Sequence, residues 1–136
     1  MALIVQKFGG TSVANTERLF RVAQIVTDKY KEGNSMVVVV SAQGDSTDDL
    51  IEKAHEISAN PSKREMDMLL STGEQVSASL LAMAIETLGF PVISLAAWQI
   101  GMKTNSTYSN ARLKSIDTER LSRELEMRKI VIVTGF

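Results

Sequence analysis

Residues 36–50, MVVVVSAQGDSTDDL, establish the fold class. The first five residues are apolar without a break, which is typical of a strand covered on both faces in a parallel sheet. Small residues and a glycine follow, and Asp48 and Asp49 then suit the first turn of a helix. Ser46 with Asp49 three residues later also has the spacing of a capping box. The segment predicts a strand, a loop and a helix in succession.

Three further apolar runs predict strands of the same kind. They are ALIVQ (2–6), PVISL (91–95) and KIVIVT (129–134). Helical patterns lie between them: a helix over 16–32 that stops before Gly33, two or three helices over 47–88 with a break at Asn60-Pro61, and a helix from Asp117 to about 128. Strands that alternate with helices predict an α/β fold with a mostly parallel sheet.

Composition narrows the functional classes. The chain has 136 residues, enough for one domain with a core, and a net charge of -1. This balance argues against a general attraction to nucleic acid or to an anionic membrane. The absence of cysteine and the single histidine, His55, argue against a transition-metal site. The N-terminal apolar run is too short for a signal peptide or a membrane span, so we expect a cytoplasmic protein.

The stretch KFGGTSV (7–13) is the first candidate site, because it follows a predicted strand. In open α/β sheets, ligands bind outside the carboxyl ends of the strands. Gly9 and Gly10 allow the backbone to approach a ligand closely, and Lys7 adds a positive charge for an anion such as phosphate. The stretch matches neither G-x-G-x-x-G nor the Walker pattern. A simple strand–helix turn with a surface lysine is the alternative.

Two further candidate sites come later in the chain. After the second strand, Ser41 and Thr47 can hydrogen-bond a ligand, although Ser46 and Thr47 can also merely cap a helix. The stretch 74–88 predicts a helix packed well inside, with a wide apolar face made by Val76, Leu80, Leu81, Ala84 and Leu88. In STGEQ (71–75), Glu74 enters this apolar helical run, where a carboxylate is costly unless it has a partner such as a ligand ammonium group. Its alternative role is a capping box with Ser71.

Four segments together resemble the aspartokinases. They are KFGGTSV, VVVVSAQGDSTDDL, MLLSTGEQVSASLLAMAI and KIVIVTGF, in the same order and at similar spacing. The resemblance implies the amino-acid kinase (carbamate kinase-like) fold, a three-layer αβα sandwich. It also implies transfer of the γ-phosphoryl group of ATP to the side-chain carboxylate of L-aspartate, which gives 4-phosphoaspartate and begins lysine, threonine and methionine synthesis. L-aspartate and ATP are thus the expected ligands, and a homo-oligomer is expected.

The resemblance also implies roles for individual residues. Lys7, Gly9 and Gly10 would hold the ATP phosphates, with Lys7 as the catalytic cation, and Ser41 would lie between phosphate and substrate. Thr47 and Glu74 would bind aspartate, with Glu74 opposite its ammonium group. An aspartate side chain is already an anionic nucleophile near pH 7. The chemistry therefore needs no general base, but it needs positive charge, backbone donors and Mg²⁺ bound through the ATP phosphates.

The sequence departs from the aspartokinase pattern in two respects. Tyr108 stands where family members often carry a histidine. Aspartokinases also continue beyond the last strand, so residues 1–136 are expected to be the N-terminal half of the catalytic domain, without the nucleoside-binding half and the ACT domains. We expect this chain alone to be inactive and to self-associate through an unpaired sheet edge. Another acyl-phosphate-forming kinase, acting on glutamate or carbamate, and a non-enzymatic phosphate-binding module remain alternatives.

Overall fold

The computed structural model describes residues 2–100, 103–104, 113–115 and 118–135. The chain order of its elements is β1 (Leu3–Phe8), the 3-10 helix η1 (Gly10–Val13), α1 (Thr16–Lys31), β2 (Ser35–Val40), α2 (Ser46–Ile57), α3 (Lys63–Thr87), β3 (Val92–Leu95), the 3-10 helix η2 (Ala97–Ile100), β4 (Lys103–Thr104), β5 (Leu113–Ser115), α4 (Thr118–Glu126) and β6 (Ile130–Thr134). Tyr108 and Asp117 lie outside the described residues.

Four parallel strands form the main sheet in the order β1-β2-β6-β3. The last strand in the chain, β6, thus lies between β2 and β3. All five residues of β6 are buried, as expected for a central strand with both faces covered. β4 and β5 form a separate antiparallel pair.

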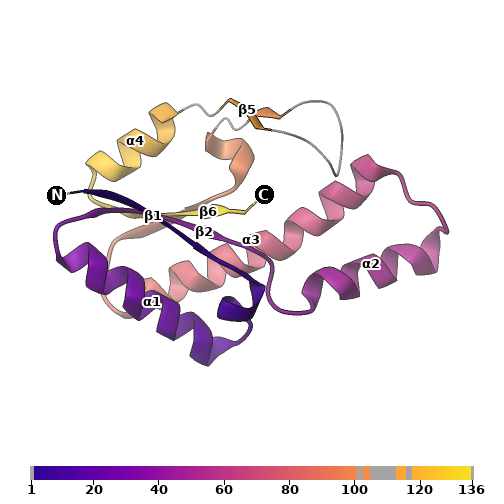
Figure 1. Cartoon of the computed structure of the whole chain (residues 1–136), viewed down its shortest axis with the longest axis horizontal. Coiled ribbons are helices and arrows are strands. Elements are labelled where there is room, and N and C mark those ends of the chain that lie inside the picture. Colours follow the sequence, from indigo (N-terminus) through magenta and orange to yellow (C-terminus); the bar gives the residue numbers. More distant parts are fainter. Residues whose placement is uncertain (1, 101–102, 105–112, 116–117, 136) are drawn as a thin grey trace.

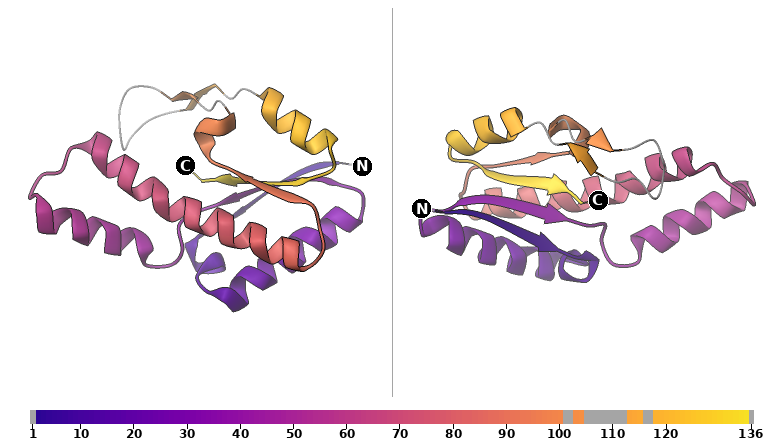
Figure 2. Two further views of the ribbon diagram at one scale, coloured as in Figure 1. Left: turned by 180° about the vertical axis from the view of Figure 1, so that it is seen from behind. Right: turned by 45° about the horizontal axis from the view of Figure 1, so that its top comes forward.

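Helices cover both faces of the sheet, which gives three layers (Figure 1). The helices α1 and α3 pack on one face, where Val26, Val38, Leu81 and Ile132 belong to one buried cluster. On the other face, α4 packs through Leu121 and Leu125 against a smaller cluster that includes Val131 and Val133. Figure 2 shows the same layers from behind and from above. The αβα sandwich predicted from the sequence is confirmed.

The sequence located the main strands and helices. Helix α1 begins after Asn15, whose side chain accepts a hydrogen bond from the Arg18 backbone, and it ends before Gly33, which has a φ of 95°. The side chain of Ser62 accepts a hydrogen bond from the Glu65 backbone and so caps α3, as predicted. The predicted capping box at Ser46 is wrong, because Asp45 occupies the cap position and Ser46 is already helical.

The outward face of α3 differs from the prediction. The sequence indicated a wide apolar face that includes Val76 and Leu80, but these side chains are 49% and 37% exposed. Leu81 and Ala84 of the predicted face are buried, as predicted, and the helix buries Ser77 and Ala78 beside them. By length and composition alone α3 could cross a membrane. Its packing against the sheet and α1 identifies it as a core helix of this fold.

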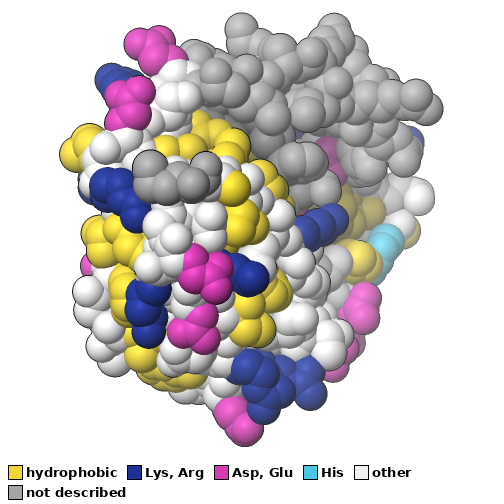
Figure 3. Space-filling model, turned by 60° about the vertical axis from the view of Figure 1, so that its left-hand side comes forward, with side chains coloured by type: hydrophobic (Ala, Val, Ile, Leu, Met, Phe, Trp, Pro, Cys, Tyr) yellow, Lys and Arg dark blue, Asp and Glu magenta, His cyan; other side chains and the backbone are white. Residues whose placement is uncertain are grey.

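The helices α2 and α3 form a hairpin that projects beyond the sheet (Figure 1). None of the residues of α2 is buried, and α2 packs mainly against α3. At the opposite end of the molecule, charged side chains of both signs lie scattered among apolar ones (Figure 3).

Candidate active site

The loops that follow three neighbouring strands are joined by backbone hydrogen bonds. The N–H of Gly44, after β2, donates to the carbonyl of Gly10, after β1, at 3.0 Å. The N–H of Gly135, after β6, donates to the Val40 carbonyl at 2.6 Å. The carboxyl edge of the sheet therefore presents one continuous backbone surface, and the first two candidate loops lie together on it.

Lys7 is a strand residue whose side chain has a fixed direction. The sequence predicted a first strand over 2–6, but β1 continues to Phe8, and Lys7 is paired in register with Val39 of β2. Alternation along the strand places Lys7 on the same face as Val5, away from α1 and α3. Its exposed ammonium group makes no ion pair within the described part of the chain.

The two glycines of the first loop stand in different surroundings. A Cβ atom on Gly10 would lie 2.6 Å from the Ala42 carbonyl oxygen, so tight packing between the loops requires glycine there. A Cβ atom on Gly9 would meet nothing within 4 Å, and the φ of Gly9 is -76°, which other residues adopt readily. Neither packing nor backbone conformation requires glycine at residue 9. The open space above Gly9 suits the close approach of a ligand.

The second loop is tied to the first by side chains as well. The amide of Gln43 donates to the Val13 carbonyl at 2.8 Å, and the hydroxyl of Ser46 donates to the Gln43 carbonyl at 2.6 Å.

Ser41 and Thr47 are both half-buried. Thr47 lies inside the first turn of α2, so it does not cap the helix. The alternative in which Ser46 and Thr47 serve only as caps is therefore wrong.

Glu74 lies in the middle of α3, and the Ser-Thr-Gly-Glu run does not interrupt the helix. Ser71 and Thr72 donate their hydroxyls to the carbonyls three residues earlier, at 2.8 and 2.7 Å. The proposed capping box between Ser71 and Glu74 is wrong, because α3 begins at Lys63. Glu74 is half-buried, and it has no hydrogen bond or ion pair in the residues that the structure describes.

Lys7 and Glu74 influence each other electrostatically. Burial raises the pKa of the Glu74 carboxyl from 4.5 to about 7, because a partly dehydrated carboxylate is unfavourable. The positive charge of Lys7 acts in the opposite direction and lowers this pKa. The charge of Lys7 thus acts on the Glu74 carboxyl, although the two residues form no ion pair within 4.0 Å. The Lys7 cation therefore does not neutralise the Glu74 carboxylate through a direct contact.

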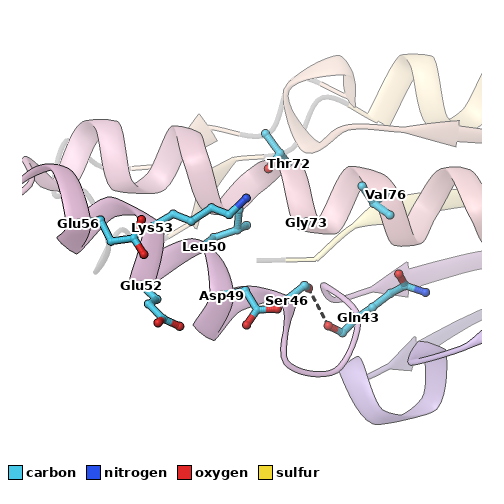
Figure 4. Close-up of a pocket in the computed structure, with 10 residues that line it drawn as sticks. All are labelled: Gln43, Ser46, Asp49, Leu50, Glu52, Lys53, Glu56, Thr72, Gly73 and Val76. Carbon is cyan, nitrogen blue, oxygen red and sulfur yellow. Dashed lines mark hydrogen bonds between the residues drawn. The ribbon is translucent and has the colours of Figure 1, made fainter.

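A pocket of about 470 Å³ lies between α2 and α3 (Figure 4). It is lined by Gln43, Ser46, Asp49, Leu50, Glu52, Lys53, Glu56, Thr72, Gly73 and Val76. None of the six predicted site residues lines it. Successive residues of a helix are about 100° apart, so Glu74 points away from the side that carries Thr72 and Val76. The Glu74 side chain therefore lies on another side of α3 than the pocket, and the pocket is not the predicted site.

The sequence did not predict the close packing of small residues beside the candidate site. A Cβ atom on Gly73 would lie 2.9 Å from the Cβ of Ala42, and one on Gly135 would lie 2.7 Å from the Val40 carbonyl oxygen. A glycine inside a helix is unfavourable, and this signal could have singled out Gly73. Nothing in the sequence marks Ala42.

Comparison with known proteins identifies the family of this chain. The family model described as "Amino acid kinase family" matches residues 2–136. This chain belongs to that family. The aspartokinase of Bacillus sp. (strain MGA3) is 54% identical over 136 residues, and aspartokinase 2 of Bacillus subtilis (strain 168) is 52% identical over the same length. This family member spans about a third of the length of these relatives.

Solved structures of the family have the same fold. The aspartate kinase of Synechocystis matches 98% of this chain, and 22% of its own chain is covered, with a TM-score of 0.85 and 48% identity. Aspartokinase III of E. coli, solved in complex with aspartate and ADP, matches the whole chain over 41% of its own length, with a TM-score of 0.83 and 21% identity. At that identity the second match supports the fold alone.

Proposed function

We propose that this chain is the N-terminal half of the catalytic domain of an aspartate kinase. The complete enzyme would transfer the γ-phosphoryl group of ATP to the side-chain carboxylate of L-aspartate, giving 4-phospho-L-aspartate. The main observation is that the loops after β1 and β2 are joined at the carboxyl edge of the sheet, together with a half-buried carboxylate, Glu74, on which the positive charge of Lys7 acts. Such a cation and carboxylate suit a substrate that carries an ammonium group at one end and meets phosphate at the other. Identity of about 50% to aspartokinases supports this choice.

The proposed acceptor site contains Glu74 and Thr47. The Glu74 carboxylate would bind the ammonium group of aspartate, which supplies the partner that a half-buried carboxylate needs. Thr47, half-buried in the first turn of α2, would donate its hydroxyl to a substrate carboxylate. Both residues lie at the base of the α2–α3 hairpin, beside the loop that follows β2.

The proposed phosphate site contains Lys7, Gly9, Gly10 and Ser41. The open space at Gly9 and the exposed cation of Lys7 fit a nucleotide phosphate. Within the described ranges, no group of three His, Asp or Glu side chains could hold a metal ion. Mg²⁺ would accordingly be held mainly by the phosphate oxygens, where it supplies positive charge.

The chemical step requires no proton transfer in this proposal. A side-chain carboxyl group with an ordinary pKa of about 3.9 is ionised near pH 7, so an aspartate oxygen can attack the γ-phosphorus directly. The bond between the γ-phosphorus and the β,γ-bridging oxygen breaks, and ADP leaves with its electron pair. Lys7 offsets the negative charge that builds up as the two anions approach.

The wider role follows the family resemblance. We propose a cytoplasmic enzyme of lysine, threonine and methionine synthesis that forms a homo-oligomer and acts on small molecules, with neither nucleic acid nor a membrane as a partner. A nucleoside-binding half and ACT domains would complete it. The chain of 136 residues alone would then lack kinase activity.

The test is ADP release by the complete enzyme with aspartate, glutamate or carbamate as the acceptor. We expect activity with aspartate only. Lys7→Ala should reduce turnover by about 10²–10³-fold, because one preorganised electrostatic contact is lost, and it should leave aspartate binding nearly unchanged. Preference for glutamate or carbamate would favour another acyl-phosphate-forming kinase. Phosphate binding without ADP release would favour a binding module, and normal turnover of Lys7→Ala would contradict the role of Lys7.

A further inference from the structure

Ala42 lies between two glycines that belong to different parts of the candidate site. On one side, the position of a Cβ atom on Gly10 is 2.6 Å from the Ala42 carbonyl oxygen. On the other side, the position of a Cβ atom on Gly73 is 2.9 Å from the Ala42 Cβ. Real Cβ atoms essentially never approach another heavy atom closer than 3.0 Å. Ala42 itself is buried. One small residue of the loop after β2 therefore contacts both the loop after β1 and the helix α3.

Backbone conformation does not explain glycine at residues 10 and 73. The left-handed glycines of the described chain are Gly33, Gly44 and Gly89, so Gly10 and Gly73 have conformations that alanine can adopt. In a helix interior, alanine is favoured over glycine. Contact with Ala42 is the feature of the structure that excludes a side chain at Gly73, which directly precedes Glu74. The contact thus fixes how near α3 comes to the loops at the carboxyl edge.

We propose that Ala42, held between Gly10 and Gly73, sets the separation between Glu74 and the loop after β1 that carries Gly9 and Gly10, here called the phosphate loop. Ala42 and Gly73 are then positioning residues for the acceptor amino acid, an inference that rests on the proposed function of Glu74 and Lys7. One added methyl group at Gly73 must push α3 away from Ala42 by about half an ångström, since ordinary contact begins at 3.4 Å. Small displacements of binding groups have large effects on productive geometry.

The first test is Gly73→Ala in the complete enzyme, with the KM of aspartate and of ATP measured separately. We expect the KM of aspartate to rise about tenfold and the KM of ATP to stay within about twofold, because the helix that carries Glu74 moves and the phosphate loop does not. The double variant Ala42→Gly/Gly73→Ala moves the methyl group from one side of the contact to the other. Its KM for aspartate should return to within about threefold of wild type.

Gly10→Ala provides the matched contrast. Its added methyl group would meet the backbone carbonyl of Ala42, which remains in Ala42→Gly. Ala42→Gly should therefore rescue Gly73→Ala and fail to rescue Gly10→Ala. A wild-type KM for aspartate in Gly73→Ala, or a double variant no better than the single one, would overturn the proposal. If Gly73→Ala does not fold, Ala42→Val enlarges the same contact from the other side, and an unchanged KM for aspartate there would also overturn it.

A second readout separates this proposal from the proposed function. The titration of Glu74, followed by NMR with ¹³C-labelled glutamate, reports its burial and the influence of Lys7 without any substrate. Gly73→Ala should shift the titration midpoint, and Ala42→Gly/Gly73→Ala should restore it. Enzyme that shows these shifts but no aspartate-dependent ADP release would refute the proposed function alone. An unchanged midpoint in Gly73→Ala would refute the positioning role alone.

Discussion

Glu74→Gln tests the acceptor site most directly, because it removes the charge and keeps the shape. With a pKa of about 7, Glu74 is roughly one-tenth ionised at pH 6 and roughly nine-tenths ionised at pH 8. If the carboxylate binds the substrate ammonium group, aspartate affinity should rise about tenfold over this range, or about 1.4 kcal/mol, and level off above pH 8. The direction is upward with pH because the binding form is the deprotonated one. In Glu74→Gln the rise should disappear.

Glu74 should also make the folding stability of wild type depend on pH, and stability should fall with rising pH where aspartate affinity rises. Because its pKa is higher in the folded chain, Glu74 holds its proton more tightly there than in the unfolded chain. The free energy of unfolding should therefore fall as pH rises from about 4.5 to about 7. The full shift would correspond to about 3 kcal/mol, and partial exposure reduces this to about 1–2 kcal/mol. Glu74→Gln should accordingly be more stable than wild type at pH 8 and similar at pH 4.

Two assays cover both expectations. Isothermal titration calorimetry of the complete enzyme with aspartate at pH 6, 7 and 8 measures the affinity, and urea unfolding at pH 4 and 8 measures the stability. Glu86→Gln, an exposed substitution on the same helix, is the control. Aspartate binding that is independent of pH in wild type, or an equal pH dependence in Glu74→Gln, would refute the role of Glu74. Lower stability of Glu74→Gln at pH 8 would refute the electrostatic reasoning.

Gly9→Ala should leave the melting temperature within about 2 °C of wild type, because no atom lies within 4 Å of the added methyl group. The same substitution should weaken ATP binding, measured by titration, at least tenfold. Unchanged ATP affinity would exclude close phosphate contact there. Glu124→Gln should lower stability at pH 7 by about 1 kcal/mol in urea unfolding, because Lys129 binds this carboxylate at 3.0 Å. The hydrogen bond from Lys129 lowers the pKa of Glu124, so wild type should lose this advantage as pH falls below about 4; a constant difference would contradict it. The isolated chain should self-associate in sedimentation velocity, because the edge strand β1 is open and its Val5 side chain is 62% exposed. Val5→Lys should reduce this self-association, and the control Ile57→Lys should leave it unchanged. Equal effects of the two variants would argue against association through β1.

Much of the fold could be predicted because the decisive signals are local. The valine-rich run at 36–40 and the run at 129–134 are continuously apolar, and both became central parallel strands. Strand order was not predictable from such runs, since pairing between distant segments leaves no local pattern. The exposed face of α3 was mispredicted for a related reason. Leu81 was predicted correctly, but Val76 and Leu80 also look like core residues by type, and only packing shows that Ser77 and Ala78 are buried in their place.

The sequence proposes a set of residues for the candidate site, but it does not predict their arrangement in space. Position after a strand singled out Lys7 and Ser41, and a carboxylate in an apolar run singled out Glu74. Propensity did not reveal that Asp45 is the cap residue of α2 or that the Ser46 hydroxyl donates to the Gln43 carbonyl. The raised pKa of Glu74 depends on tertiary burial, and that burial arises from segments far apart in the sequence.

The position of β6 has a consequence for how the chain acquires its structure during synthesis. Val37 of β2 pairs with Val131 of β6, 94 residues later (131 − 37 = 94). Until the ribosome releases that late segment, β2 has one open side and β3 has no neighbour in the main sheet. Contacts of such long sequence separation form slowly, because a large loop must close first. The nascent protein would therefore expose valine-rich strands for several seconds, an interval in which chaperone binding would be most useful.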